Sequence, residues 1–303
     1  MTISKQIKIG LIGFGKVGSE FSKGFQQSGL FEVWVYDKIL RDPLRKRRVE
    51  ERATELNVKL AGDNKSLTKA CEIILSTVTV DAAVEVAKKT APFLNEQKTY
   101  VDLNSTSPGI KREIAHIIEK TGANFIEGAI LGTISSYGLQ VPIMVCGKRV
   151  EKFQNLMNRM GMNITYVGQV IGKASTIKML RSVFAKGVEA LLLEMLQGAA
   201  RYDVQNYVME DICKYMDSNS FLLIASNWLT THAVHAERRF REMEQVIKTL
   251  EEIGINPVMA TATREKLKAS VDLRLEEFFE GRQPKDYDQV IAAIEAKTSF
   301  KHL

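Results

Sequence analysis

Three glycines near the start of the chain have the spacing of a nucleotide-binding turn. The segment Gly13-Phe14-Gly15-Lys16-Val17-Gly18 fits G-x-G-x-x-G, with an apolar strand-like run before it and a helical pattern after it. In such a turn the first glycine permits the tight bend, the second lets the backbone approach a pyrophosphate, and the third allows close packing of the helix on the strand. The N–H groups at the start of the helix attract the phosphates. The motif therefore predicts that these six residues bind a dinucleotide.

The residues after the second strand-like run bear on which dinucleotide is bound. Asp37 lies about 20 residues past the motif, where an acidic side chain accepts hydrogen bonds from the adenosine ribose hydroxyls. Its charge would repel a 2′-phosphate, whereas Lys38 and Arg41 could pair with that phosphate. NAD is the favoured cofactor, and NADP is the alternative.

A lysine in the second half of the chain has surroundings that suit proton transfer. Lys178 lies in a helical pattern beside the apolar residues Ile177, Met179 and Leu180. Burial disfavours the charged ammonium, so it would lower the lysine pKa toward the range that general acid/base catalysis requires. A lysine in an amphipathic helix is more often simply solvated, and these residues alone leave both interpretations open.

Two kinds of pattern indicate how these residues are positioned. In the first half, apolar strand-like runs alternate with helical spacing, which favours a parallel sheet. The predicted strands are residues 7–12, 32–36, 58–61, 72–78, 99–103, 124–127 and 142–146, with a last edge strand at 164–167. From Gly172 onward helical patterns dominate. The sequence predicts an α/β fold in which a Rossmann-type parallel-sheet domain (1–168) is joined by a long interdomain helix to an all-α domain (169–303).

The composition excludes several classes of protein. Hydrophobic residues make up 45% of the chain and charged residues 26%, which is ordinary globular usage. No apolar run could span a bilayer and no secretory signal is evident, so we expect a cytoplasmic protein without membrane contact. The cysteines and histidines lack zinc-site spacing, so no metal is expected. The net charge of +6 suits polyanions, but no aromatic-interleaved basic motif accompanies it, which makes nucleic acid an unfavoured partner.

Four motifs occur in the order and spacing of a known superfamily. They are Gly13 to Gly18, the strand end Ser76-Thr77-Val78, the run from Asp102 to Pro108, and Gly172 followed by Lys178. Over nearly its whole length the chain resembles the β-hydroxyacid dehydrogenases, which include 3-hydroxyisobutyrate and 6-phosphogluconate dehydrogenases. It is most similar to a branch whose C-terminal domain has no known function. The resemblance implies hydride transfer between NAD(P) and a 3-hydroxy acid or a 3-hydroxy-2-amino acid, with Lys178 exchanging a proton with the substrate hydroxyl.

The resemblance also implies roles for other residues. Thr77 and Val78 would contact the cofactor, and Asn104 and Ser105 the substrate. The family usually has an asparagine one turn beyond the lysine, and here Ser182 would take that catalytic position. Arg181 could bind a substrate carboxylate or form a salt bridge across the domain junction, and both interpretations stay open.

The glycine-rich run after the next strand departs from the family pattern. Most members have Asp-Ala-Pro-Val-Ser-Gly-Gly, whereas this chain reads Glu127-Gly-Ala-Ile-Leu-Gly-Thr133. Leu131 thus replaces a serine that cradles a carboxylate. This favours a bulkier or less polar substrate than a small 3-hydroxy acid, such as an aromatic 3-hydroxy-2-amino acid.

Two alternatives to a dehydrogenase remain at this stage. The chain could be an imine reductase, because those enzymes share the scaffold, but they generally lack the lysine. It could also be a non-catalytic dinucleotide-binding regulatory protein. As for assembly, the helix at residues 190–196 is apolar on several faces and must be buried. We therefore expect a homodimer formed through the helical domain.

Overall fold

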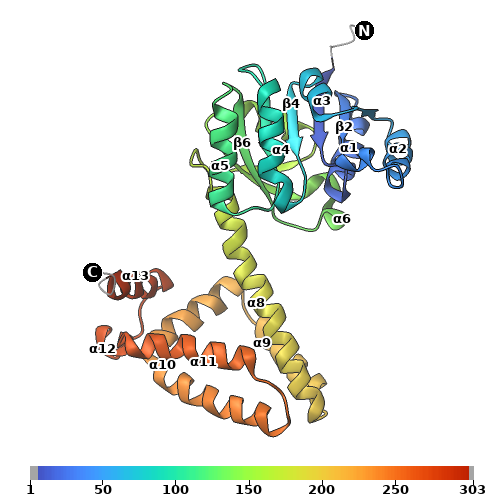
Figure 1. Ribbon diagram of the computed structural model, residues 1–303. Helices are drawn as coiled ribbons and strands as arrows, with labels where there is room; N and C mark the ends of the chain where they lie inside the picture. The colour runs from blue at the N-terminus through green and yellow to red at the C-terminus, as the bar shows by residue number, and fades with distance from the viewer. Residues whose placement is uncertain (1–5, 300–303) are drawn as a thin grey trace. The chain divides into compact units, whose positions relative to one another are not determined.

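The computed structural model describes residues 6–299 and divides the chain into two compact units (Figure 1). The first unit comprises residues 1–183 and the second residues 184–303. The long helix α8 (Lys173–Arg201) begins in the first unit and ends in the second. The part of α8 that carries Lys178 therefore belongs with the sheet that holds the glycine motif.

A single sheet forms the first unit. Its strand order is β3-β2-β1-β4-β5-β6-β7-β8. The strands are β1 (Ile7–Ile12), β2 (Phe31–Tyr36), β3 (Lys59–Leu60), β4 (Ile73–Ser76), β5 (Thr99–Asp102), β6 (Asn124–Ile130), β7 (Pro142–Cys146) and β8 (Asn163–Tyr166). The strand order reverses between β1 and β4, and ligands bind at the carboxyl ends of the strands at such a point.

The direction of the last two strands departs from the predicted parallel sheet. The prediction is confirmed from β1 to β6, but β7 runs antiparallel to β6, and β8 runs parallel to β7. The connection at residues 131–141 contains only the short helix α6 (Ile134–Tyr137) and the 3₁₀ turn η4 (Gly138–Gln140). A parallel crossover needs a dozen or more residues, so β7 must turn back along β6.

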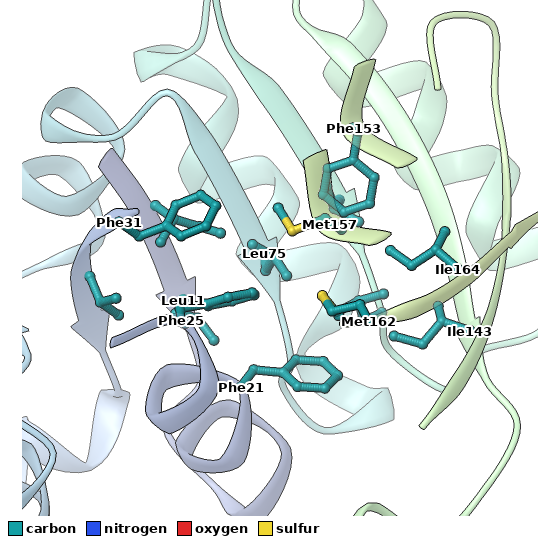
Figure 2. Packing of buried hydrophobic residues seen from close by; sticks show 14 of the residues in the cluster. Leu11, Phe21, Phe25, Phe31, Leu75, Ile143, Phe153, Met157, Met162 and Ile164 are labelled. Atoms are coloured by element: carbon teal, nitrogen blue, oxygen red, sulfur yellow. The ribbon is translucent and has the colours of Figure 1, made fainter. Parts of the chain in front are cut away.

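Helices cover both faces of the sheet because successive strand residues point to opposite sides. Leu11 belongs to the core cluster under α1 (Lys16–Ser28), α2 (Lys46–Glu55) and α7 (Glu151–Arg159). Its neighbour Ile12 belongs to the cluster under α3 (Asn64–Ala70), α4 (Ala83–Thr90) and α5 (Pro108–Glu119). Figure 2 shows the first cluster, with Phe21 and Phe25 of α1 on one side of Leu75 and Met157 on the other. Three further 3₁₀ turns are η1 (Lys38–Arg41), η2 (Val80–Ala82) and η3 (Ala91–Phe93).

The second unit is helical throughout its described part, as predicted. Besides the end of α8 it contains α9 (Gln205–Asp217), α10 (Phe221–Glu252), α11 (Val258–Asp272), α12 (Leu275–Phe278) and α13 (Tyr287–Ser299). Glu194 of α8 accepts hydrogen bonds from the backbone N–H groups of Met259 (2.7 Å) and Ala260 (2.8 Å), which fastens the start of α11 to α8. Within residues 6–299, no helix has the length and apolar character that crossing a bilayer requires.

Candidate active site

The glycine turn between β1 and α1 has the geometry of a nucleotide-binding loop. Gly13 has φ +96°, and a Cβ atom there would lie 2.5 Å from the carbonyl oxygen of Thr77. A Cβ atom on Gly18 would lie 2.1 Å from the carbonyl oxygen of Gly13. Gly15 instead has no heavy atom within 4 Å of such a Cβ position. Gly13 and Gly18 are thus needed for packing, and the open space at Gly15 fits a pyrophosphate close to the backbone.

Asp37 joins the end of β2 to the glycine turn. Its Oδ2 accepts a hydrogen bond from the N–H of Phe14 (2.7 Å), and its Oδ1 accepts one from the N–H of Ile39 (3.0 Å). Phe14 is buried in the core, and its carbonyl oxygen accepts a hydrogen bond from the guanidinium of Arg52 (3.0 Å), so this residue shapes the turn from within the protein. Lys38 is exposed beside Asp37, and Lys16 is exposed at the start of α1.

A cleft of about 330 Å³ opens at the carboxyl ends of the central strands. Its volume is in the range of small-molecule sites. Among the described residues 6–299, Lys178 alone is an ionisable residue that lines it. Six predicted site residues border it: Val17, Thr77, Val78, Asn104, Ser105 and Lys178. The remaining lining residues are Thr79, Val80, Leu103, Ile130, Gly132 and Ile134.

Lys178 contacts the loop that follows β5. Its Nζ donates a hydrogen bond to the Oγ of Ser105 at 2.6 Å. Partial burial lowers the pKa of Lys178, and the positive charge of Lys111 lowers it further. Both effects favour the neutral amine, so this residue combines access to the cleft with the tendency to exchange a proton.

The side chain of Asn104 is engaged within the protein. Asn104 is 3% exposed, its Oδ1 accepts from the N–H of Val78 (2.7 Å), and its Nδ2 donates to the Oγ of Ser76 (2.9 Å). Asn104 therefore ties the loop after β4 to the loop after β5. Of the two residues that the resemblance assigned to the substrate in this loop, Ser105 is the exposed one.

Three residues with a predicted catalytic or substrate-binding role, Ser182, Arg181 and Leu131, do not line this cleft. The hydroxyl of Ser182 donates to the carbonyl oxygen of Lys178, one turn earlier on the same helix (2.9 Å). The guanidinium of Arg181 donates to the carbonyl oxygen of Leu131. The catalytic role of Ser182 and the substrate contacts of Arg181 and Leu131 stay predictions.

A buried ion pair beneath the cleft was not predicted. Lys111 and Asp102 are both fully buried, with 3.2 Å between Nζ and Oδ1. Lys111 also donates to the carbonyl oxygens of Asp102 (2.9 Å) and Gly128 (3.2 Å). Burial raises the pKa of Asp102, and the charge of Lys111 opposes that change. One signal existed in the sequence, because Lys111 shares the apolar face of its helix with Ile114 and Ile118.

Comparison with known proteins identifies the family. Residues 8–168 match the model of the NAD binding domain of 6-phosphogluconate dehydrogenase, and residues 199–270 match a domain of unknown function, DUF1932. The chain therefore belongs to the family of proteins with a 6-phosphogluconate dehydrogenase-type NAD-binding domain, and its relatives are of the β-hydroxyacid dehydrogenase type.

Individual relatives agree with this assignment. A solved conserved protein of unknown function, described as structurally similar to 3-hydroxyacid dehydrogenases, is 33% identical over 89% of this chain and 99% of its own, with a TM-score of 0.60. Human mitochondrial 3-hydroxyisobutyrate dehydrogenase is 25% identical over 58% of this chain and 52% of its own length. An imine reductase from Pseudomonas sp. shares the fold, with a TM-score of 0.72, 16% identity, and coverage of 96% of this chain and 100% of its own.

Proposed function

We propose that this protein is an NAD(P)-dependent dehydrogenase that acts on a 3-hydroxy acid or a 3-hydroxy-2-amino acid, with Lys178 as general acid/base. The observation that carries the proposal is the position of the Lys178 amine. It borders the cleft at the strand ends and is bonded to Ser105 beside the end of β5. The bound nicotinamide would accept or donate the hydride.

The residues present fit such a cofactor. The first-turn N–H groups of α1 have no acceptor within the helix and suit a pyrophosphate. The open space at Gly15 permits its approach, and Asp37 lies at the end of β2 for the adenosine ribose. Val17, Thr77 and Val78 border the cleft where the nicotinamide end would lie.

The chain's own residues would then orient the substrate and move its proton. During oxidation the neutral amine of Lys178 would accept the hydroxyl proton, and during reduction the ammonium would return it. The hydroxyl of Ser105 would hold the amine in place and be free to bond a polar substrate group. The apolar residues Ile130 and Ile134 on the cleft wall favour an apolar substituent such as a phenyl ring.

A substrate screen tests the proposal. The purified protein is incubated with NAD⁺ or NADP⁺ and with 3-hydroxyisobutyrate, 6-phosphogluconate or phenylserine, and reduced cofactor is measured by absorbance. In parallel, cyclic imines are offered with NADH and NADPH. Turnover of a hydroxy compound supports the proposal. Turnover of imines alone would identify an imine reductase, and cofactor binding without any turnover would indicate a regulatory protein.

Cofactor preference is expected to depend on the charge of Asp37. We expect NAD⁺ to bind more tightly than NADP⁺, because the carboxylate repels a 2′-phosphate. Asp37→Asn keeps an oxygen that can accept from the N–H of Phe14 but removes the charge, so it should narrow the ratio of dissociation constants about tenfold, or roughly 1.4 kcal/mol. Titration of both cofactors measures this. Tighter NADP⁺ binding to the unmutated protein would show that Lys38 and Arg41 outweigh the carboxylate.

The pH dependence should follow the lowered pKa of Lys178. Oxidation requires the neutral amine, so kcat/KM for the hydroxy substrate should rise with pH through a pKa below the ordinary lysine value. Reduction requires the ammonium, so kcat/KM for the keto product should fall through the same pKa. Profiles measured in both directions check the sign. Parallel profiles that rise in both directions would rule Lys178 out as the titrating group.

We also propose that the protein is a homodimer formed through the helical unit. Within that unit Leu193, Leu222 and Leu223 are 62%, 67% and 57% exposed, and Phe221 is exposed beside the last two in the sequence. Apolar side chains gathered in a patch, unlike a single exposed leucine, typically mark an interface. Light scattering at micromolar concentration should therefore give twice the chain mass. Leu193→Glu should shift the protein toward the monomer, whereas Leu44→Glu, at an exposed leucine in the first unit, should not. A monomeric unmutated protein would contradict this proposal.

A further inference from the structure

Glu127 is a fully buried carboxylate with an unusual set of partners. It lies in β6 and is 0% exposed. Its Oε1 accepts a hydrogen bond from the N–H of Ser175 (2.6 Å), and its Oε2 accepts from the N–H of Gly172 and from the thiol of Cys146 (3.1 Å). Burying a carboxylate raises the free energy of the folded state unless hydrogen bonds compensate, and here three donors from two parts of the chain provide those bonds.

The bonds of Glu127 fasten the start of α8 to the sheet. The first N–H groups of a helix lack intrahelical acceptors and carry partial positive charge. A carboxylate accepts their hydrogen bonds and also balances that charge. No acidic residue lies in the first turn of α8 itself, so Glu127 supplies this charge from a strand. Gly172 has φ +103°, and a Cβ atom there would lie 2.9 Å from the guanidinium of Arg112, which further restricts how the helix begins.

The strand register places this anchor beside the anchor of the substrate loop. Glu127 on β6 is paired with Asp102 on β5, so the two side chains point to the same face of the sheet. The Oδ1 of Asp102 accepts from the N–H of Asn104 (2.8 Å), at the start of the loop that carries Ser105. Two adjacent carboxylates therefore hold the two segments that meet at the Lys178–Ser105 hydrogen bond.

We propose that Glu127 is a positioning residue that sets the place of Lys178 in the cleft by fixing the first turn of α8. Lys178 lies three residues after Ser175, less than one turn along the helix, so a displacement of the anchored turn moves the amine directly. This inference rests on the proposed function only in treating Lys178 as the acid/base. The position of its amine can be measured without any substrate.

The test follows the reactivity of Lys178 toward reductive methylation by formaldehyde and a borohydride, as a function of pH. Only the neutral amine reacts, so peptide mass spectrometry yields the pH midpoint of each lysine. In the unmutated protein Lys178 should react with a midpoint below the ordinary lysine value, because burial and the positive charge of Lys111 lower the pKa of Lys178. In Glu127→Gln the amide has a single oxygen, so the side chain cannot accept from the N–H groups of Gly172 and Ser175 as the two carboxylate oxygens do. This variant should raise the midpoint by about one unit as the amine leaves its site, and it should speed amide hydrogen exchange at residues 172–178.

A matched pair of variants changes the other side of the same contact. Proline is tolerated in the first helical turn, so Ser175→Pro removes the N–H donor while Glu127 stays, whereas Ser175→Ala keeps the donor. The proline variant should reproduce the shift of Glu127→Gln, and the alanine variant should not. This pair keeps the proposal falsifiable if Glu127→Gln fails to fold.

The outcomes separate this proposal from the proposed function. If Glu127→Gln and Ser175→Pro lower thermal stability but leave the Lys178 midpoint unchanged, Glu127 is only structural and the inference is wrong. If both variants shift the Lys178 midpoint, the inference about Glu127 holds. If the unmutated protein oxidises none of the hydroxy compounds, that second result contradicts the dehydrogenase assignment but not the inference about Glu127.

Discussion

Replacing Lys178 with methionine is expected to lower turnover by at least ~10²-fold while the cofactor dissociation constant stays nearly unchanged. Methionine keeps much of the apolar length of the side chain but cannot carry a proton, and a positioned acid/base typically contributes about 10²–10⁴-fold. The dinucleotide is expected to bind at the glycine turn, which the substitution leaves intact. Steady-state kinetics and a fluorescence titration of the cofactor measure the two quantities.

The matched control for this variant is Lys186→Met on the same helix. Lys186 is exposed and does not line the cleft, so its replacement should leave turnover within about twofold. If Lys178→Met instead keeps near-full activity on a substrate that the unmutated protein turns over, Lys178 is not the acid/base. Lys173 or a histidine of the helical unit would then have to be considered.

The second large effect concerns stability. Lys111→Met should lower the free energy of unfolding by about 3–5 kcal/mol, because it leaves the buried carboxylate of Asp102 without its cation. The loss of the two hydrogen bonds to backbone carbonyl oxygens of β5 and β6 should also loosen the loop that carries Ser105. Denaturant titration of the variant and the unmutated protein gives the difference.

An exposed ion pair provides the comparison for that effect. Lys88 and Glu113 lie 3.8 Å apart with more than half of each side chain exposed, and such pairs contribute about 0–1 kcal/mol. Lys88→Met should therefore change the unfolding free energy by no more than ~1 kcal/mol. Equal losses for Lys88→Met and Lys111→Met would mean that the buried pair adds nothing beyond a surface one.

The parts of the fold that the sequence predicted depend on local patterns. Buried runs such as Ile9–Ile12 are apolar over consecutive residues, and the strands they predict are present. The antiparallel direction of β7 follows from the short connection between β6 and β7. The pattern of apolar residues within a strand carries no information on strand direction. The predicted strand at 72–78 ends earlier, at Ser76, because Thr77 and Val78 leave the sheet to line the cleft.

The candidate site divides in the same way. The glycine turn is a local motif, and its residues lie where the spacing placed them. Asn104 has the role of joining two loops because its partners Ser76 and Val78 are distant in the sequence and become neighbours only in the folded sheet. Glu127 could be recognised from the sequence only as a departure from a family pattern. Its function as the cap of α8 depends on residues 45 and 48 positions further along the chain.

The most direct test of the central claim is the transfer of deuterium from substrate to cofactor. A hydroxy substrate found in the screen is labelled with deuterium on the carbon that bears the hydroxyl, and the reduced cofactor is isolated and weighed by mass spectrometry. Hydride transfer from that carbon predicts one deuterium in each reduced nicotinamide, with the label appearing at least ~10²-fold more slowly for Lys178→Met. Reduced cofactor without deuterium, or equal rates of labelling in the two proteins, would contradict Lys178-assisted oxidation of a hydroxy acid.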